Sequence, residues 1–375
     1  MNAPDVVDVV ALGESMVTFL PTRAGRLADV PSFDRGIGGA ESNVACGLAA
    51  AGHRVRWVSR VGADGFGDHL VETVGGHGVD VSSVGRDPSR PTGVYFRTAG
   101  DRATDAHEVA YYRAGSAASA MSVENLDLPS VRAGRVLHLS GITAALSDDC
   151  LGLLRRLTAP GEGRPVVSFD VNHRAGLWQA AEGPRVLLEL ARRADIVFVG
   201  EDEAQEAWAV AGGPAAIRAM LPEPGVLVVK QGEAGATAFV SAAGSGGPAA
   251  RFPAPLGGSA HAAPAAGETH PRPATAQGTF VPALDVDVVA TTGAGDAFAA
   301  GFLSATLCGL PLRDRLRHGH LWAAAALTAP GDLAAPPARD HADRLTALDD
   351  EAWGTLRLGP GWTQADRAPE EVPTP

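Results

Sequence analysis

One short segment of the sequence combines glycines with a carboxylate in a pattern that suits phosphate chemistry. It reads Thr292-Gly293-Ala294-Gly295-Asp296 and is followed by small residues typical of a packed helix. Unpaired N–H groups at a helix N-terminus favour an anion, and glycines let that anion approach the backbone. Phosphoryl transfer needs this charge stabilisation and a carboxylate that deprotonates the attacking hydroxyl. We therefore predict that Gly293, Ala294 and Gly295 form an anion hole and that Asp296 is the catalytic base.

The segment at residues 292–296 also fits a purely structural interpretation, and two other phosphate-binding motifs can be tested against the sequence. Asp296 can simply cap the helix, because Asp is common at helix starts and glycines are common in strand-to-helix turns. A P-loop is excluded, since it needs a Gly-Lys-Ser/Thr sequence and Lys230 is the only lysine in the chain. A dinucleotide fingerprint is also missing after the first predicted strand, where Gly13 is followed by Glu14. Any nucleotide is therefore expected to place its phosphates at residues 293–295.

Alternating apolar and helical segments must position this turn. Short apolar runs predict buried strands of a mostly parallel sheet, at residues 6–12, 136–140, 166–170, 196–199 and 226–230. A further strand is predicted at 286–289, directly before the turn. Helical patterns lie between them, at residues 41–51, 148–158, 184–193, 201–210 and 297–308. The expected fold is α/β, with a doubly wound, mostly parallel sheet in a three-layer arrangement.

Three regions interrupt or extend this alternation. Residues 17–37 and 92–113 alternate apolar with polar side chains, which predicts a small exposed β-sheet acting as a lid. Residues 241–278 are mostly Gly, Pro, Ala and Ser with few large apolar side chains, which predicts a flexible insertion. We expect residues 1–354 to form one domain and residues 355–375 a disordered tail.

Composition narrows the choice of partners. The net charge of −12 and the scattered basic residues argue against nucleic acid, so a small molecule is the expected partner. The cysteines Cys46, Cys150 and Cys308 lack metal-ligand spacing, and the histidines form no ligand cluster. No apolar run reaches the roughly 20 residues that span a bilayer, so we predict a cytoplasmic protein without membrane contact. Pairing of exposed lid sheets would give a homo-oligomer.

Two motifs resemble the signatures of one enzyme family, the ribokinase-like (PfkB) carbohydrate kinases. The segment Thr292-Gly293-Ala294-Gly295-Asp296-Ala297-Phe298 is similar to the second signature of that family. The first signature is resembled by Gly38-Gly39-Ala40-Glu41-Ser42-Asn43, and the loop that usually follows it by Val61-Gly62-Ala63-Asp64-Gly65. The likeness extends from about Val6 to Leu348, so it implies a ribokinase-like fold for nearly the whole chain.

The resemblance also implies roles for single residues. Asp296 matches the catalytic base of the family, and Glu203 matches a glutamate that helps to hold Mg²⁺, although Gly200 replaces the Asn that usually begins that motif. On its own, Glu203 would be read as a complement to a helix dipole. ATP is the expected phosphate donor, and the residues expected to bind it are Asn172, Lys230, Gly232 and Gly235. Because Ala290 stands where the family usually has an Asp of a monovalent-cation site, K⁺ activation is not predicted.

Within the family, three segments resemble 2-keto-3-deoxygluconate kinases. They are Gly39-Ala40-Glu41-Ser42-Asn43, Tyr111-Tyr112-Arg113-Ala114-Gly115 and Asp170-Val171-Asn172-His173-Arg174. Arginine suits a carboxylate because its planar fork donates two parallel hydrogen bonds. The residues expected to bind a sugar acid are Gly39, Asn43, Tyr95, Tyr111, Arg113, Arg174 and Asp332. Without the resemblance, each arginine would be read as a solvated surface side chain and the tyrosines as lid core.

The resemblance therefore implies an ATP-dependent kinase that phosphorylates the primary hydroxyl of a small sugar acid such as 2-keto-3-deoxygluconate. Two alternatives remain open at this point. One is a related kinase for a neutral sugar, fructose or ribose, or for a nucleoside. The other is a non-catalytic sugar or nucleotide sensor, which would normally have lost the base that Asp296 represents here.

Overall fold

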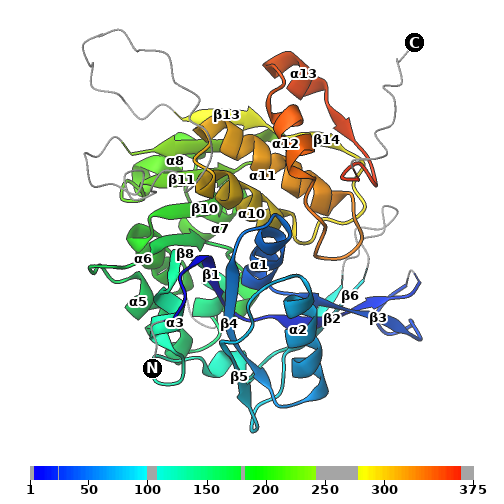
Figure 1. Cartoon of the computed structure of the whole chain (residues 1–375), viewed down its shortest axis with the longest axis vertical. Coiled ribbons are helices and arrows are strands. Elements are labelled where there is room, and N and C mark those ends of the chain that lie inside the picture. The colour runs from blue at the N-terminus through cyan, green and yellow to red at the C-terminus, as the bar shows by residue number, and fades with distance from the viewer. Residues whose placement is uncertain (1–3, 24, 99–107, 179–181, 242–277, 365–375) are drawn as a thin grey trace.

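A computed structural model describes residues 4–23, 25–98, 108–178, 182–241 and 278–364 (Figure 1). Within these residues nine strands form the main sheet, in the order β13-β12-β11-β10-β9-β8-β1-β4-β5. Neighbouring strands from β11 to β5 are parallel, and β12 runs antiparallel to both of its neighbours. The strands are β1 (Val7–Leu12), β4 (Val55–Gly62), β5 (Val84–Asp87), β8 (Gly134–Ser140), β9 (Val166–Asp170), β10 (Ile196–Gly200), β11 (Val226–Lys230), β12 (Gly235–Val240) and β13 (Thr279–Pro282).

Helices cover both faces of this sheet, because alternate strand residues point to opposite faces and both sets are apolar. One face packs against α1 (Ala40–Ala50), α2 (Gly65–Gly76), α10 (Ala294–Leu307), α11 (Leu312–Leu327), α12 (Arg339–Thr346) and α13 (Asp350–Thr355). The other packs against α3 (Leu128–Arg132), α4 (Gly141–Ala144), α5 (Asp148–Thr158), α6 (Gly183–Arg193), α7 (Glu201–Trp208) and α8 (Gly213–Met220). The predicted three-layer α/β fold is confirmed, and no helix of the described residues is long and apolar enough to cross a membrane.

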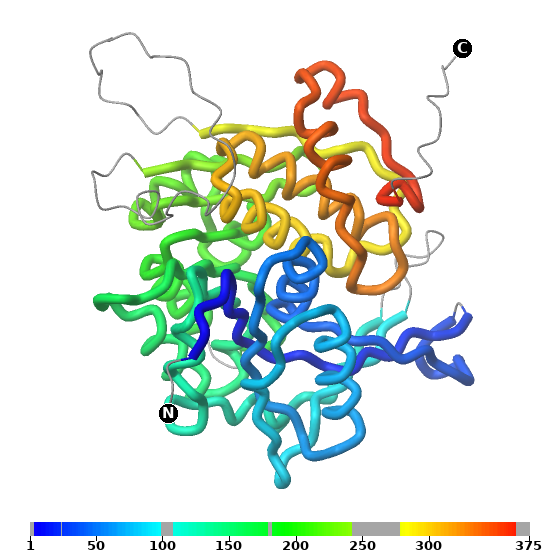
Figure 2. Tube along the Cα trace, viewed as in Figure 1, coloured from blue at the N-terminus to red at the C-terminus, as the bar shows by residue number. Residues whose placement is uncertain are grey.

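The two stretches predicted as a lid contribute to a separate small sheet. Its strands follow the order β3-β2-β6-β7 and project from one side of the main body (Figure 2). They are β2 (Met16–Pro21), β3 (Phe33–Gly38), β6 (Val94–Arg97) and β7 (Val109–Tyr112). Their side chains alternate between two environments, since Tyr95 and Tyr111 pair across the sheet on one face while Phe96 stacks on Phe19 on the other. The small sheet therefore offers one polar aromatic face to the site described below.

Two predictions about the C-terminal third are wrong. The strand predicted at 286–289 is not formed: only Val286 of that run is in a strand, β14 (Asp285–Val286), which pairs with β15 (Arg357–Leu358) apart from the main sheet. The tail predicted to be disordered from residue 355 is ordered as far as 364, because the buried indole of Trp362 donates a hydrogen bond to Thr328 (3.2 Å). Residues 365–375 and nearly all of the predicted insertion, residues 242–277, lie outside the described residues.

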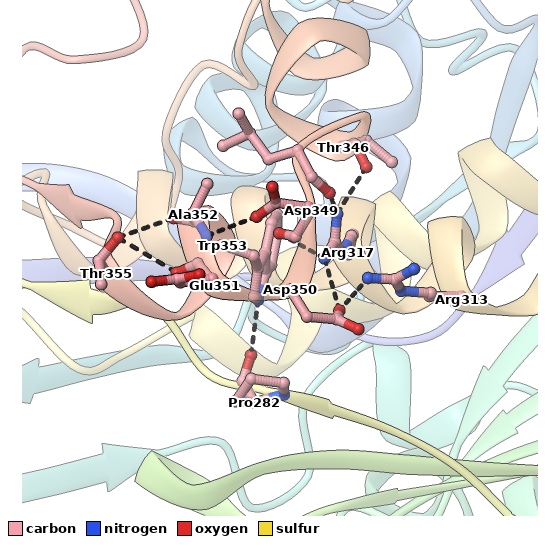
Figure 3. A network of polar contacts seen from close by, with 11 residues as sticks. Pro282, Arg313, Arg317, Thr346, Asp349, Asp350, Glu351, Ala352, Trp353 and Thr355 are labelled. Carbon is pink, nitrogen blue, oxygen red and sulfur yellow. Dashed lines mark hydrogen bonds and ion pairs between the residues drawn. The ribbon is translucent and has the colours of Figure 1, made fainter.

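One buried arginine anchors the C-terminal helices (Figure 3). The guanidinium of Arg317, in α11, donates to the carbonyl oxygens of Thr346 (2.8 Å), Leu348 and Asp349 (3.3 Å). It also pairs with the Asp350 carboxylate at 3.1 Å and lies 4.5 Å from the centre of the Trp353 ring. Its side chain is only 1% exposed and its hydrogen bond to Thr346 is buried, so that carbonyl oxygen would lose its partner if the guanidinium were removed.

We predict that Arg317→Met lowers the free energy of unfolding by about 3 kcal/mol, because it leaves the buried Thr346 carbonyl without its donor and breaks a partly buried ion pair. Urea denaturation monitored by fluorescence measures the change. Arg313→Ala is the matched control, since Arg313 pairs with the same exposed carboxylate of Asp350 but is itself 44% exposed; it should cost less than about 1 kcal/mol. Equal losses in the two variants would contradict the anchoring role.

Candidate active site

A cavity of about 320 Å³ opens where the carboxyl ends of β9 and β11 meet the N-termini of α1 and α10, beneath the polar face of the small sheet. The carboxyl edge of an open α/β sheet is the usual ligand-binding edge. Most of the residues predicted from the sequence line this cavity: Gly39, Asn43, Tyr95, Tyr111, Arg113, Asn172, Arg174, Glu203, Lys230, Gly293, Gly295, Asp296 and Asp332. Residues separated by more than 250 positions in the sequence thus share one wall.

The predicted anion hole stands at the start of α10. Gly293 is the residue before the helix and has a φ of 80°, and a Cβ there would overlap the carbonyl oxygen of Asp332. Only glycine fits this position without strain. The backbone N–H groups of Ala294, Gly295 and Asp296 make no hydrogen bond to an acceptor within the described residues. They are therefore free to bind an anion at the positive end of the helix dipole.

Asp296 faces the cavity and does not cap the helix. The residue that precedes α10 is Gly293, and no side-chain capping bond is made there. The Asp296 carboxylate instead accepts a hydrogen bond of 2.8 Å from the side-chain amide of Asn43, in α1. Burial raises the pKa of Asp296 to about 7, the amide of Asn43 opposes that rise, and the nearby carboxylate of Asp170 adds to it. A carboxylate with this pKa is well matched to accept a proton near neutral pH.

Asn43 is expected to set the pH dependence of the site. Its amide stabilises the ionised form of Asp296, so Asn43→Ala should raise the pKa of Asp296 above 7. Because the base works only when ionised, the acid limb of kcat/KM should move to higher pH, by about one unit. A pH–rate profile measures the shift. Asn125→Ala, whose amide bonds the carbonyl oxygen of Ala120 outside the cavity, is the control; an unchanged or lower midpoint for Asn43→Ala would contradict this role.

Lys230 places a positive charge beside the anion hole. Its ammonium lies 3.1 and 3.2 Å from the two carboxylate oxygens of Asp170, which ends β9. Burial alone would lower the pKa of Lys230, but Asp170 and Glu203 outweigh it and the pKa is raised. The lysine is therefore charged. A Cβ built on Gly295 would lie 3.6 Å from the ammonium, so the cation borders the turn that holds the free N–H groups.

The residues around Glu203 fit a magnesium ion that also binds phosphate. One carboxylate oxygen of Glu203 accepts the N–H of Gly200 (2.9 Å), and burial raises the pKa of Glu203. The buried side-chain oxygen of Asn172 has no hydrogen-bond partner among the described residues, and Asp170 lies close by. Mg²⁺ is usually held by one or two carboxylates, with water and substrate phosphates completing an octahedron. That arrangement agrees with the lack, in the described residues, of a cluster of three or more side chains able to hold a metal alone.

The small sheet contributes two buried ion pairs to the opposite end of the cavity. Arg113 pairs with Glu14, which follows β1, and the guanidinium lies 5.9 Å from the centre of the Tyr111 ring. Asp332 accepts one hydrogen bond from the Tyr95 hydroxyl and another from Arg97. The oxygens of Asp332 are thus held in place before any ligand arrives. Aromatic rings and fixed polar groups of this kind suit a small polyhydroxylated ligand.

Some predicted residues have a different place in the structure. Ala294 contributes its backbone to the turn but does not line the cavity. Gly232 and Gly235 lie in the turn between β11 and β12, away from the cavity, with φ values of 56° and 136°. A Cβ on Gly235 would overlap the carbonyl oxygen of Val281, so this glycine is required by the fold. Arg174 lines the cavity with a side chain 55% exposed, 3.7 Å from Glu203.

Four charged residues at the site were not predicted from the sequence. Asp170 ends a predicted strand, which is a signal that could have identified it. Glu14 follows the first strand in the same way. Glu41 lies next to the predicted Asn43, and its buried carboxylate accepts hydrogen bonds from Ser140 and Thr143, both 2.7 Å. Arg97 carries no local signal, because its partner Asp332 is 235 residues away.

The chain matches known proteins over most of its length. The model of the pfkB family carbohydrate kinases matches residues 7–255 and 274–339. A fold and a site of this kind define a phosphotransferase that acts on an alcohol, and the chain belongs to the pfkB family of carbohydrate kinases.

Individual relatives fit this assignment. The 2-dehydro-3-deoxygluconokinase of Bacillus subtilis (strain 168) is 32% identical over 343 residues, which cover 89% of this chain and 94% of that protein. A probable chloroplastic fructokinase of Arabidopsis thaliana is 29% identical over 326 residues, 84% of this chain and 75% of that protein. The crystal structure of a PfkB protein from Polaromonas sp. JS666 superposes with a TM-score of 0.71 at 29% identity, covering 91% of this chain and all of that one.

Proposed function

We propose that this enzyme transfers the γ-phosphoryl group of ATP to the primary hydroxyl of a small sugar acid, with 2-keto-3-deoxygluconate as the substrate. The observation that carries the proposal is the pairing of a base with an anion site. The Asp296 carboxylate lies in the first turn of α10, beside three backbone N–H groups that have no protein acceptor in the described residues. The alcohol and the phosphate would meet at that point.

Different residues would stabilise the phosphate charge and accept the proton. The N–H groups at residues 294–296 and the ammonium of Lys230 would stabilise the charge of the transferring group. Asp296, with its pKa near 7, takes the proton of the sugar hydroxyl. The oxygen of that hydroxyl forms the new bond to the γ-phosphorus. The bond from that phosphorus to the β,γ-bridging oxygen breaks, and ADP leaves with the electron pair. A Mg²⁺ held through Glu203, Asp170 and Asn172 would neutralise phosphate charge when bound.

The sugar would occupy the end of the cavity under the small sheet. Tyr95 and Tyr111 line it, and Asn43 already holds the base that the hydroxyl must reach. The half-exposed guanidinium of Arg174 donates to the carbonyl oxygen of His173 (2.8 Å) and lies 3.7 Å from Glu203, and Arg113 also lines the cavity. These two arginines are the proposed partners of the substrate carboxylate, because a guanidinium binds a carboxylate with paired hydrogen bonds.

A neutral sugar is the second candidate substrate. Arg113 is already paired with Glu14, and this pairing reduces the attraction between Arg113 and a substrate carboxylate. A substrate panel separates the two. We expect ADP release, followed with a coupled assay in the presence of ATP and Mg²⁺, to have a kcat/KM at least about tenfold higher with 2-keto-3-deoxygluconate than with fructose, ribose or adenosine. A higher kcat/KM with one of the neutral substrates would identify that compound, and not the sugar acid, as the preferred substrate. Phosphorus NMR of the product identifies the hydroxyl that was phosphorylated.

A further inference from the structure

Arg97 and Asp332 form the most buried ion pair at the substrate end of the cavity. Their side chains are 4% and 3% exposed, and a guanidinium nitrogen lies 2.6 Å from one carboxylate oxygen of Asp332. Asp332 and Tyr95 line the cavity, whereas Arg97 stands behind them. Arg97 can therefore affect a ligand only through the charge and position of Asp332.

Asp332 contacts both halves of the site. A Cβ on Gly38, at the end of β3, would overlap the Tyr95 hydroxyl and crowd the Asp332 carboxylate. The backbone of Asp332 packs against Gly293, so closely that only glycine fits there. The same residue thus joins the wall of the sugar subsite to the anion hole.

An unpaired carboxylate at this position would oppose an anionic substrate. Like charges a few ångströms apart repel strongly where water is largely excluded. The other carboxylate at this end of the cavity, Glu14, is likewise paired with an arginine of the small sheet, Arg113. Asp332 and Glu14 are thus each matched by one guanidinium, which leaves Arg174 as the more exposed positive charge.

We propose that Arg97 is a positioning residue that determines specificity for an anionic sugar: it cancels the charge of Asp332 and fixes that carboxylate as an acceptor for a sugar hydroxyl. This inference rests on the proposed function and identifies a residue on which its substrate preference depends. Arg97 would be needed much less for a neutral sugar, because a neutral ligand is not repelled by Asp332.

The test compares KM for 2-keto-3-deoxygluconate and for fructose in variants of residue 97. Arg97→Met should raise KM for the acid about tenfold or more and KM for fructose by less than about threefold, with kcat changed less than KM. Arg97→Lys keeps the positive charge and should retain most of the preference for the acid. An equal rise in both KM values after Arg97→Met would overturn the proposal, since a purely structural role predicts that result.

The double variant Arg97→Met/Asp332→Asn removes both charges. It keeps the proposal testable if the single variant fails to fold, because it leaves no unpaired buried carboxylate. It should recover a large part of the preference for the acid, because no unpaired carboxylate remains; failure to recover it would contradict the charge argument. Arg60→Met is the matched control, as Arg60 forms a similar buried pair with Asp87 (2.9 Å) outside the cavity. If the wild-type enzyme itself prefers fructose, the proposed substrate fails; if it prefers the acid and Arg97→Met keeps that preference, only this inference fails.

Discussion

Replacing Asp296 with asparagine should lower kcat by about 10³-fold, the size expected for loss of a general base. Asparagine keeps the shape of the side chain and can still contact Asn43, but it cannot accept the proton of the sugar hydroxyl. The N–H groups at the start of α10 do not depend on this side chain, because no side-chain capping bond is made there. ATP should therefore bind with nearly unchanged affinity.

Steady-state kinetics and calorimetric titration of ATP together check this expectation. The matched control is Asp349→Asn, because Asp349 does cap its helix, accepting the N–H of Ala352 at 2.8 Å. Asparagine is an equally good cap, so that variant should keep full activity. If Asp296→Asn retained most of its activity, Asp296 would not be the base; if it lost ATP binding together with turnover, the carboxylate would have a structural role instead.

Replacing Lys230 with methionine should lower kcat/KM for ATP by about 10²-fold, comparable to the loss of one preorganised donor to a developing charge. Methionine keeps the length and the apolar part of the side chain but removes the charge beside Gly295. The variant also leaves the Asp170 carboxylate without its cation, so phosphate would face an unpaired like charge. Both effects oppose the approach of ATP.

A second buried ion pair provides a control that separates an effect on catalysis from an effect on stability. Arg164 pairs with Asp195 at 3.0 Å, with both side chains similarly buried, but neither lines the cavity. Arg164→Met should therefore reduce the free energy of unfolding without a comparable loss of kcat/KM. Activity of Lys230→Met within about threefold of the wild-type value would show that the ammonium does not act on phosphate. An equal kinetic loss in the two variants would attribute the effect to stability.

The central strands were predictable because their signal is local. Strands β9 and β11 have the bounds that their apolar runs predicted, since a strand buried on both faces reads as a continuous apolar segment. The run at 286–289 has the same appearance but a different environment. There the N–H groups of Val289 and Ala290 donate to the carbonyl oxygen of Leu327, in α11, which no local pattern shows.

The order of residues 355–364 could not be predicted for a similar reason. The segment has no helical or strand periodicity in its sequence, and single contacts with distant elements hold it in place. Trp362 packs into the core and bonds Thr328, and Arg317 holds the preceding helices from α11. Composition alone gives little indication of such anchors.

The candidate site also has a part that could be predicted from the sequence and a part that could not. The anion hole and Asp296 are contiguous in sequence, so their chemistry was readable from residue types and spacing. The partners that tune them were not: Asn43 was predicted as a substrate-binding residue, and its bond to Asp296, 253 residues away, has no local signal in the sequence. Arg97 and Asp332 acquire their relation only when the small sheet lies over the loop that follows α11.

The most direct test of the account is a crystal structure of the enzyme with Mg²⁺ and a non-hydrolysable ATP analogue. We predict that the terminal phosphate lies about 3 Å from the backbone nitrogens at residues 294–296, a hydrogen-bonding distance, with the Lys230 ammonium and the Asp296 carboxylate on either side of it. A terminal phosphate bound elsewhere in the cavity, with those nitrogens facing solvent, would contradict the central claim.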